Sequence, residues 1–198
     1  MKYYFGGVNG VGKTTVLRLI EKALPELKVV HGTSLLMDRL GIPGDYYALR
    51  AISQVKLRPE YTAAVHELFE TYPAQDILLD SHYLNIRYGE IDVVAEDWLS
   101  LFDALLLVSA KPELIWQRLS NDAAHRDRAL LAADTTQQEQ ELTYLNYILQ
   151  TESVFHKFAQ EHKVQSFIID NSTTPETAAQ SFITYRASLA TVRQHPSG

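Results

Sequence analysis

A glycine-rich segment of eight residues constrains the fold more than any other part of this sequence. Residues 7–14 read Gly-Val-Asn-Gly-Val-Gly-Lys-Thr, a full match to the pattern G-x-x-x-x-G-K-[ST]. A short apolar run at residues 3–5 precedes them, and the apolar residues that follow recur on one helical face, at Val16, Leu17, Ile20 and Leu24. Strand, loop and helix therefore occur in the order that a phosphate-binding loop requires.

The residue types of this loop suit the phosphates of a nucleotide. Glycines let the backbone turn its N–H groups inward around phosphate oxygens. Lys13 can reach the β and γ oxygens, and the Thr14 hydroxyl can ligate Mg²⁺. We therefore predict that a nucleotide is held by a run of seven consecutive residues: Asn9, Gly10, Val11, Gly12, Lys13, Thr14 and Thr15.

Composition excludes several classes of protein. The chain has 198 residues, of which 46% are hydrophobic, so it can build the core of one large domain. A net charge of -6 without any basic run argues against nucleic-acid binding, and the lack of cysteine removes disulfides and thiolate chemistry. No apolar stretch approaches the ~20 residues that span a bilayer, and the loop lies too near Met1 for a signal peptide. We expect a cytoplasmic protein without a membrane partner.

Five short apolar runs predict strands, and helical patterns separate them. The runs lie around residues 2–6, 27–30, 76–80, 103–109 and 164–170. Continuous apolar character is typical of strands covered on both faces, and alternation with helices favours a parallel sheet. We predict one α/β domain over residues 1–198, with the three-layer α/β/α P-loop NTPase fold and a five-stranded parallel sheet. A final helix should begin with Thr174 as its N-cap and Pro175 in its first turn.

Two regions interrupt the alternation of strands and helices. Residues 31–72 contain about three helical stretches, more than a simple crossover needs, and predict a helical insert. Residues 119–135 are polar and carry arginines, which predicts a short lid. A long helix should follow this lid, with apolar residues at Leu142, Leu145, Leu149, Phe155 and Ala159.

Missing motifs narrow the reaction. The third predicted strand ends in Asp80-Ser81, so the acidic pair with which many hydrolytic ATPases hold magnesium and activate water does not occur there. The sequence contains neither the guanine-reading N-K-x-D nor the transporter signature L-S-G-G-Q. These absences favour transfer of the γ-phosphoryl group to a second small substrate.

The chain resembles the nucleoside monophosphate kinases, and most closely the archaeal type of adenylate kinase, along most of residues 1 to about 190. Four segments carry the resemblance: residues 7–15, Gly32-Thr33, residues 79–82 (Leu-Asp-Ser-His), and Arg118-Leu119 with Arg126-Asp127. The resemblance implies ATP-dependent phosphoryl transfer to a nucleoside monophosphate, with AMP as the first candidate. It also implies a Mg²⁺ ion held by Thr14 and, through water, by Asp80.

The resemblance further assigns roles to single residues. Gly32 and Thr33 would meet the acceptor nucleoside, and an arginine would meet its phosphate, with Arg50, Arg39 and Arg87 as the candidates. Arg39 is better explained as an exposed helix charge. His82 either faces the acceptor or donates a structural hydrogen bond. Phosphoryl transfer needs positive charge around the moving group, and this charge would come from four side chains: Lys13, Arg118, Arg126 and Arg128.

Departures from the family leave alternatives open. The D-G-F-P-R segment of bacterial adenylate kinases is replaced by residues 80–84, Asp-Ser-His-Tyr-Leu, and no arginine occurs between Arg128 and Arg186. The acceptor is therefore either a nucleotide or another small molecule, such as a sugar acid, shikimate or a deoxynucleotide. A nucleotide-binding regulator or ATPase-like assembly factor that acts through a protein partner is the other alternative. The oligomeric state stays open.

Overall fold

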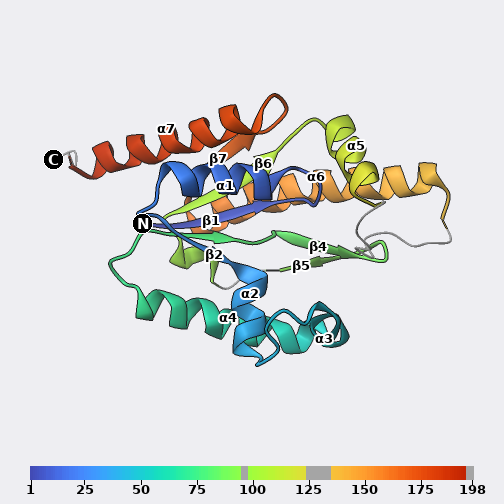
Figure 1. Cartoon of the computed structure of the whole chain (residues 1–198), viewed down its shortest axis with the longest axis horizontal. Helices are drawn as coiled ribbons and strands as arrows, with labels where there is room; N and C mark the ends of the chain where they lie inside the picture. Colours follow the sequence, from blue (N-terminus) through green and yellow to red (C-terminus); the bar gives the residue numbers. More distant parts are fainter. Residues whose placement is uncertain (95–97, 124–134, 195–198) are drawn as a thin grey trace.

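A parallel sheet of five strands forms the middle of the protein. The computed structural model describes residues 1–94, 98–123 and 135–194 (Figure 1). The strands follow the order β2-β3-β1-β6-β7, and all neighbours are parallel. Their bounds are β1 (Lys2–Gly7), β2 (Lys28–His31), β3 (Ile77–Asp80), β6 (Ala104–Ser109) and β7 (Gln165–Asp170). The predicted sheet is confirmed, and each end differs from the prediction by at most one residue.

Helices cover both faces of this sheet and give the predicted three-layer fold (Figure 1). One face packs against α1 (Lys13–Ala23) and α7 (Pro175–Gln194). The other face packs against α4 (Gln54–Thr71) and the second half of α6 (Gln137–His162). A shorter helix, α5 (Pro112–Ala123), follows β6.

The side chains of β1 alternate between these two layers. Tyr3 and Phe5 point toward α1 and α7, where Tyr3 meets Phe182 edge-on with ring centroids 5.5 Å apart. Tyr4 points the opposite way and packs against Tyr83 and Trp98. Because β1 is central and buried on both faces, the loop that follows it starts from a fixed position.

Three helices occupy the predicted insert between β2 and β3. They are α2 (Gly32–Arg39), α3 (Tyr46–Ala51) and α4, and Figure 1 shows them on one side of the sheet. Arg39 joins α2 to α4 by ion pairs with Glu60 at 2.8 Å and Glu67 at 2.9 Å. The role that the sequence favoured for Arg39, a helix charge rather than a phosphate ligand, agrees with these contacts.

An antiparallel hairpin follows β3 and was not predicted. Its strands are β4 (Leu84–Arg87) and β5 (Glu90–Val93), joined by Tyr88 and Gly89 at φ 50° and 85°. Positive φ at both central residues is the geometry of a two-residue hairpin turn that matches strand twist. A short 3-10 turn (Leu99–Leu101) leads from this region into β6.

Helix α6 buries a different face from the one its leucines suggest. Leu142, Leu145 and Leu149 are exposed, and the buried positions include Tyr144, Tyr147 and Phe155. The tyrosines are favoured inside because their hydroxyls reach backbone oxygens: Tyr144 donates to the carbonyl of Asn9 and Tyr147, at 2.9 Å, to that of Leu84. Helix α6 therefore contacts both the phosphate loop and the hairpin.

The ends of the helices follow local signals. A capping box at Thr136 and Glu139 begins α6. Thr174 caps α7 as predicted, since its Oγ1 accepts a hydrogen bond from the N–H of Thr177 at 3.2 Å. Most of the predicted lid falls on residues 124–134, outside the described residues. None of the described helices combines the length and apolar character needed to cross a bilayer.

Replacing Phe182 by alanine tests the packing of α7 on the sheet. The ring is fully buried, so Phe182→Ala should lower the free energy of unfolding by about 3–5 kcal/mol. Leu142→Ala, on the exposed face of α6, should change it by no more than about 0.5 kcal/mol. Urea denaturation followed by circular dichroism measures both, and equal losses would contradict this packing.

Candidate active site

The phosphate-binding loop adopts a backbone shape that strongly favours glycine at two positions. Gly10 and Gly12 have φ 74° and 89°, in the left-handed region. A Cβ on Gly12 would lie 2.5 Å from Nδ2 of Asn171, so space as well as conformation excludes a side chain there. The loop ends where α1 begins at Lys13, and Thr14 and Thr15 are exposed in its first turn.

Hydrogen bonds from the end of β7 and from α5 fix the conformation of this loop. The carbonyl oxygen of Val11 accepts hydrogen bonds from Nδ2 of Asn171 at 2.8 Å and from Arg118 at 3.1 Å. Arg118 also donates to the carbonyl of Asn171 at 3.1 Å. The structure thus places Arg118, predicted to carry charge for the transferred phosphoryl group, in contact with the loop backbone at Val11. Asn171 was not identified from the sequence.

Lys13 forms an ion pair with Asp80 at the end of β3. His31, at the end of the neighbouring β2, binds the second oxygen of Asp80 through Nδ1 at 3.0 Å. Burial disfavours the Asp80 carboxylate, but the hydrogen bond from His31 and the charge of Lys13 outweigh it and lower the pKa of Asp80. The same hydrogen bond raises the pKa of His31, against partial burial. His31 and Asp80 lie next to each other because they are register partners at the ends of β2 and β3.

The residues predicted to hold Mg²⁺ have the donor atoms that this ion prefers. Thr14 offers a hydroxyl oxygen beside the loop, and Asp80 offers a carboxylate that now binds Lys13 and His31. Mg²⁺ usually takes one or two protein oxygens and completes its shell with water and substrate phosphates. Among the described residues no group of three or more His, Cys, Asp or Glu side chains gathers in a way that suits a metal. A Mg²⁺ ion at Thr14 and Asp80 would therefore depend on the nucleotide.

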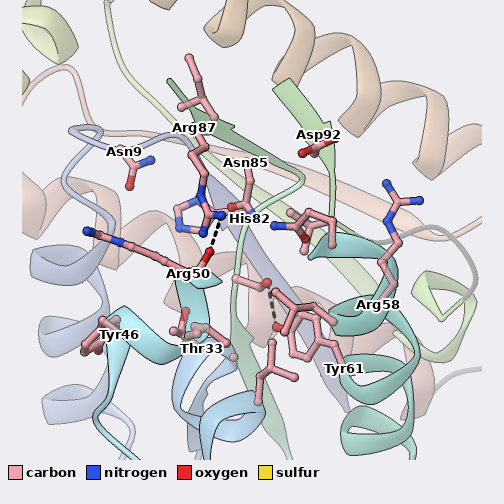
Figure 2. A pocket seen from close by; sticks show the side chains of 18 residues that line it. Asn9, Thr33, Tyr46, Arg50, Arg58, Tyr61, His82, Asn85, Arg87 and Asp92 are labelled. Atoms are coloured by element: carbon pink, nitrogen blue, oxygen red, sulfur yellow. Dashed lines mark hydrogen bonds between the residues drawn. The ribbon is translucent and has the colours of Figure 1, made fainter. Parts of the chain in front are cut away.

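A cavity of about 310 Å³ lies beside the phosphate loop, between the insert and the hairpin (Figure 2). Its described lining contains three arginines and one acidic residue: Arg50, Arg58, Arg87 and Asp92. Asn9 of the phosphate loop lines it too. The structure also brings together here all five residues predicted to bind the acceptor: Gly32, Thr33, Arg50, His82 and Arg87.

The floor of this cavity is fixed by a close contact between α4 and the start of α2. Tyr61 donates a hydrogen bond to Oγ of Ser81 at 2.8 Å (Figure 2). A Cβ on Gly32 would lie 1.9 Å from the Tyr61 hydroxyl, so the Tyr61 side chain can bond Ser81 only if residue 32 is glycine. Gly32 therefore has a packing reason to be glycine, independent of any ligand.

His82 links the cavity to the phosphate loop. Its Nδ1 is 2.7 Å from the carbonyl oxygen of Gly7, and its ring lines the cavity (Figure 2). Both roles considered for His82 from the sequence are thus compatible with one orientation: one nitrogen binds the backbone while the ring faces the acceptor space.

Two arginines join the hairpin to the insert across the cavity. Arg87 of β4 donates to the carbonyl of Arg50 at 2.8 Å, and Arg58 of α4 donates to the carbonyl of Val93 at 3.0 Å. Arg58 was missed from the sequence because its partner lies on a hairpin 35 residues away. Tyr46 lines the cavity as well. Arg126 and Arg128 lie outside the described residues.

Comparisons with known proteins identify two kinds of kinase. No protein-family model matches the chain. An adenylate kinase from Thermoplasma acidophilum is 29% identical over 129 residues, which cover 62% of this chain and 68% of that protein. A shikimate kinase from Bacteroides thetaiotaomicron superposes with a TM-score of 0.63 at 15% identity, over 94% and 98% of the two chains. A shikimate kinase from Acinetobacter baumannii, solved with shikimate, gives 0.62 at 18% identity, over 94% and 93%. At these identities the structural likeness shows a shared fold.

The pair of His31 and Asp80 makes stability depend on pH in a defined direction. Because the pKa of His31 is raised in the folded state, its charged hydrogen bond contributes fully below the unfolded-state value of about 6.5 and is lost as the pH rises through the folded value. Asp80, whose pKa is lowered, stays ionised throughout this window. We expect wild type to exceed His31→Gln in free energy of unfolding by on the order of 0.5 kcal/mol at pH about 5.5, since the His31 side chain is half exposed.

Urea titrations at pH about 5.5 and about 8.5 measure this difference. It should shrink at the higher pH. A difference that grows with pH would show that His31 binds Asp80 chiefly as a neutral ring.

Proposed function

We propose that this chain, which belongs to the nucleoside monophosphate kinase type of P-loop kinases, moves the γ-phosphoryl group of Mg-ATP to a nucleoside monophosphate, with AMP as the first candidate. One observation carries the proposal. His82 binds the Gly7 carbonyl of the phosphate loop at 2.7 Å and at the same time lines the arginine-rich cavity. An acceptor in that cavity would therefore lie beside phosphates held by the loop.

The charges of the two sides suit two anionic substrates. On the donor side the loop N–H groups and Lys13 would bind the β and γ phosphates, and Mg²⁺ would supply charge neutralisation on their oxygens. On the acceptor side the described lining carries three arginines and one carboxylate, and this net positive charge suits an anionic acceptor such as a phosphate monoester. Arg126 and Arg128 would add positive charge at the transferred group.

The ion pair of Lys13 with Asp80 suggests the order in which these contacts would form when Mg-ATP binds. Lys13 would leave Asp80 to reach a phosphate, and the carboxylate oxygen so released would be available to a water-bound Mg²⁺. His31 would keep the second oxygen of Asp80 in place during the exchange. Phosphoryl transfer then needs alignment and charge from the protein rather than covalent chemistry.

A small hydroxy acid is the second candidate acceptor. The shikimate kinases that share the fold favour it, and an arginine can bind a carboxylate as well as a phosphate. The matching adenylate kinase, which covers 62% of the chain, favours the nucleotide. Release of ADP from Mg-ATP with AMP, CMP, UMP, GMP, dTMP or shikimate added singly, with products separated by chromatography, distinguishes the two. Absence of acceptor-dependent ADP with every one of them would favour the protein-partner alternative.

Removal of the Lys13 ammonium should stop transfer without unfolding the protein. Lys13 is aimed at Asp80 and the loop, not at the apolar core, so Lys13→Ala should keep its circular dichroism spectrum. We expect its turnover to fall at least about a hundredfold, as when a donor to a developing charge is removed. A folded variant with the wild-type transfer rate would contradict the assignment of the donor site.

Removal of the Arg50 side chain should weaken binding of the acceptor and leave binding of the donor unchanged. Arg50 lines the cavity, and charge-assisted hydrogen bonds contribute about 1.5–3 kcal/mol each, so Arg50→Ala should raise the acceptor KM by about tenfold to a hundredfold. The KM for ATP should stay within about twofold. Arg39→Ala is the matched control, because Arg39 pairs with Glu60 and Glu67 outside the cavity. Equal effects of the two variants would show that the cavity does not hold the acceptor anion.

A further inference from the structure

The hairpin presents one polar face to the cavity. Asn85 and Arg87 alternate with the buried Leu84 and Ile86 along β4, so the first pair shares a side. Asp92 is the register partner of Asn85 on β5 and therefore lies on the same side. All three polar residues line the cavity. The side of the hairpin opposite the core thus forms one wall of the acceptor space.

Asp92 differs in charge from the rest of the described lining. It is the sole acidic residue among the described side chains that line the cavity. In Figure 2 Asp92 and Arg58 lie on one side of the cavity, and Asn9 of the phosphate loop lies on the other. Asp92 is exposed in β5, and within the described part of the chain its carboxylate forms no hydrogen bond or ion pair, whereas Arg58 donates to the carbonyl of Val93.

The position of Asp92 decides which part of an acceptor it meets. The acceptor phosphate must lie next to the phosphate loop, at the Asn9 side of the cavity, to receive the γ-phosphoryl group. Asp92, on the other side, would then face the part of the acceptor away from its phosphate. A carboxylate offers acceptor atoms only and repels a second anion.

We propose that Asp92 is a specificity-determining residue that accepts a hydrogen bond from a donor group at the far end of the acceptor, either a base amino group or a sugar hydroxyl. This inference rests on the proposed function, because it takes the acceptor phosphate to lie beside the loop. A bound acceptor covers Asp92, and an acceptor without the donor group leaves a desolvated carboxylate unpaired. Sites built around a hydrogen-bonding group reject analogues that lack its partner more strongly than apolar pockets reject small changes of size.

Asp92→Asn tests the inference at nearly constant shape. The amide keeps one acceptor atom but puts a donor in place of the other, so it should lose preference for acceptors that donate. Glu90→Gln is the matched control: it removes the same charge from the same strand, and Glu90 does not line the cavity. The ratio kcat/KM is measured for pairs that differ by one donor group: AMP with purine riboside 5′-monophosphate and GMP with IMP for the base amino group, and the preferred ribonucleotide with its 2′-deoxy form for the hydroxyl.

We expect wild type to prefer the nucleotide that carries the donor, either where the two nucleotides differ in the base or where they differ in the sugar. Asp92→Asn should reduce this preference, the ratio of the two kcat/KM values, by about tenfold or more. The pair that responds tells the base amino group from the sugar hydroxyl. Glu90→Gln should leave every ratio unchanged. Unchanged ratios in Asp92→Asn, with wild type active, would overturn the role of Asp92 and leave the proposed function standing. A wild type that transfers to no nucleotide would overturn the proposed function, and this inference with it.

Discussion

The hydrogen bonds on one carbonyl oxygen, that of Val11, support the geometry of the whole donor side. A loop built from glycines has few side chains with which to hold its own shape, so its conformation must be imposed from outside. Asn171 and Arg118 impose it from the end of β7 and from α5. Because β7 belongs to the same sheet as the central strand β1, the loop backbone is held in place before a phosphate arrives, and binding does not have to order it.

Local patterns in the sequence predicted the elements that depend on local physics. The phosphate loop, the five parallel strands and the start of α7 at Thr174 follow from residue order and apolar runs within about ten positions. The hairpin was missed although its signal is local too: alternating apolar residues flank Tyr88-Gly89. The buried face of α6 was not predictable in this way, because its tyrosines are buried by partners 63 and 135 residues away.

The residues of the candidate site likewise fall into two groups, those expected from the sequence and those positioned by contacts between distant segments. Gly32, Thr33, Arg50, His82 and Arg87 were expected on the acceptor from a family resemblance, and they line one cavity. His31, Arg58, Asn171 and Asp92 acquire their positions only when distant segments meet, and no spacing in the sequence marks them. A histidine at the end of a short edge strand looks like any surface residue until β3 places Asp80 next to it.

Helix α6 contacts both sides of the candidate site and fixes the spacing between them. Two tyrosines one turn apart hold the carbonyl of Asn9, on the donor side, and the carbonyl of Leu84, on the acceptor side. A helix resists stretching along its axis, so α6 would fix the distance between the donor and acceptor sides of the site independently of the substrates. Changes along α6 far from either substrate would then alter the rate of transfer more than the affinity for either substrate.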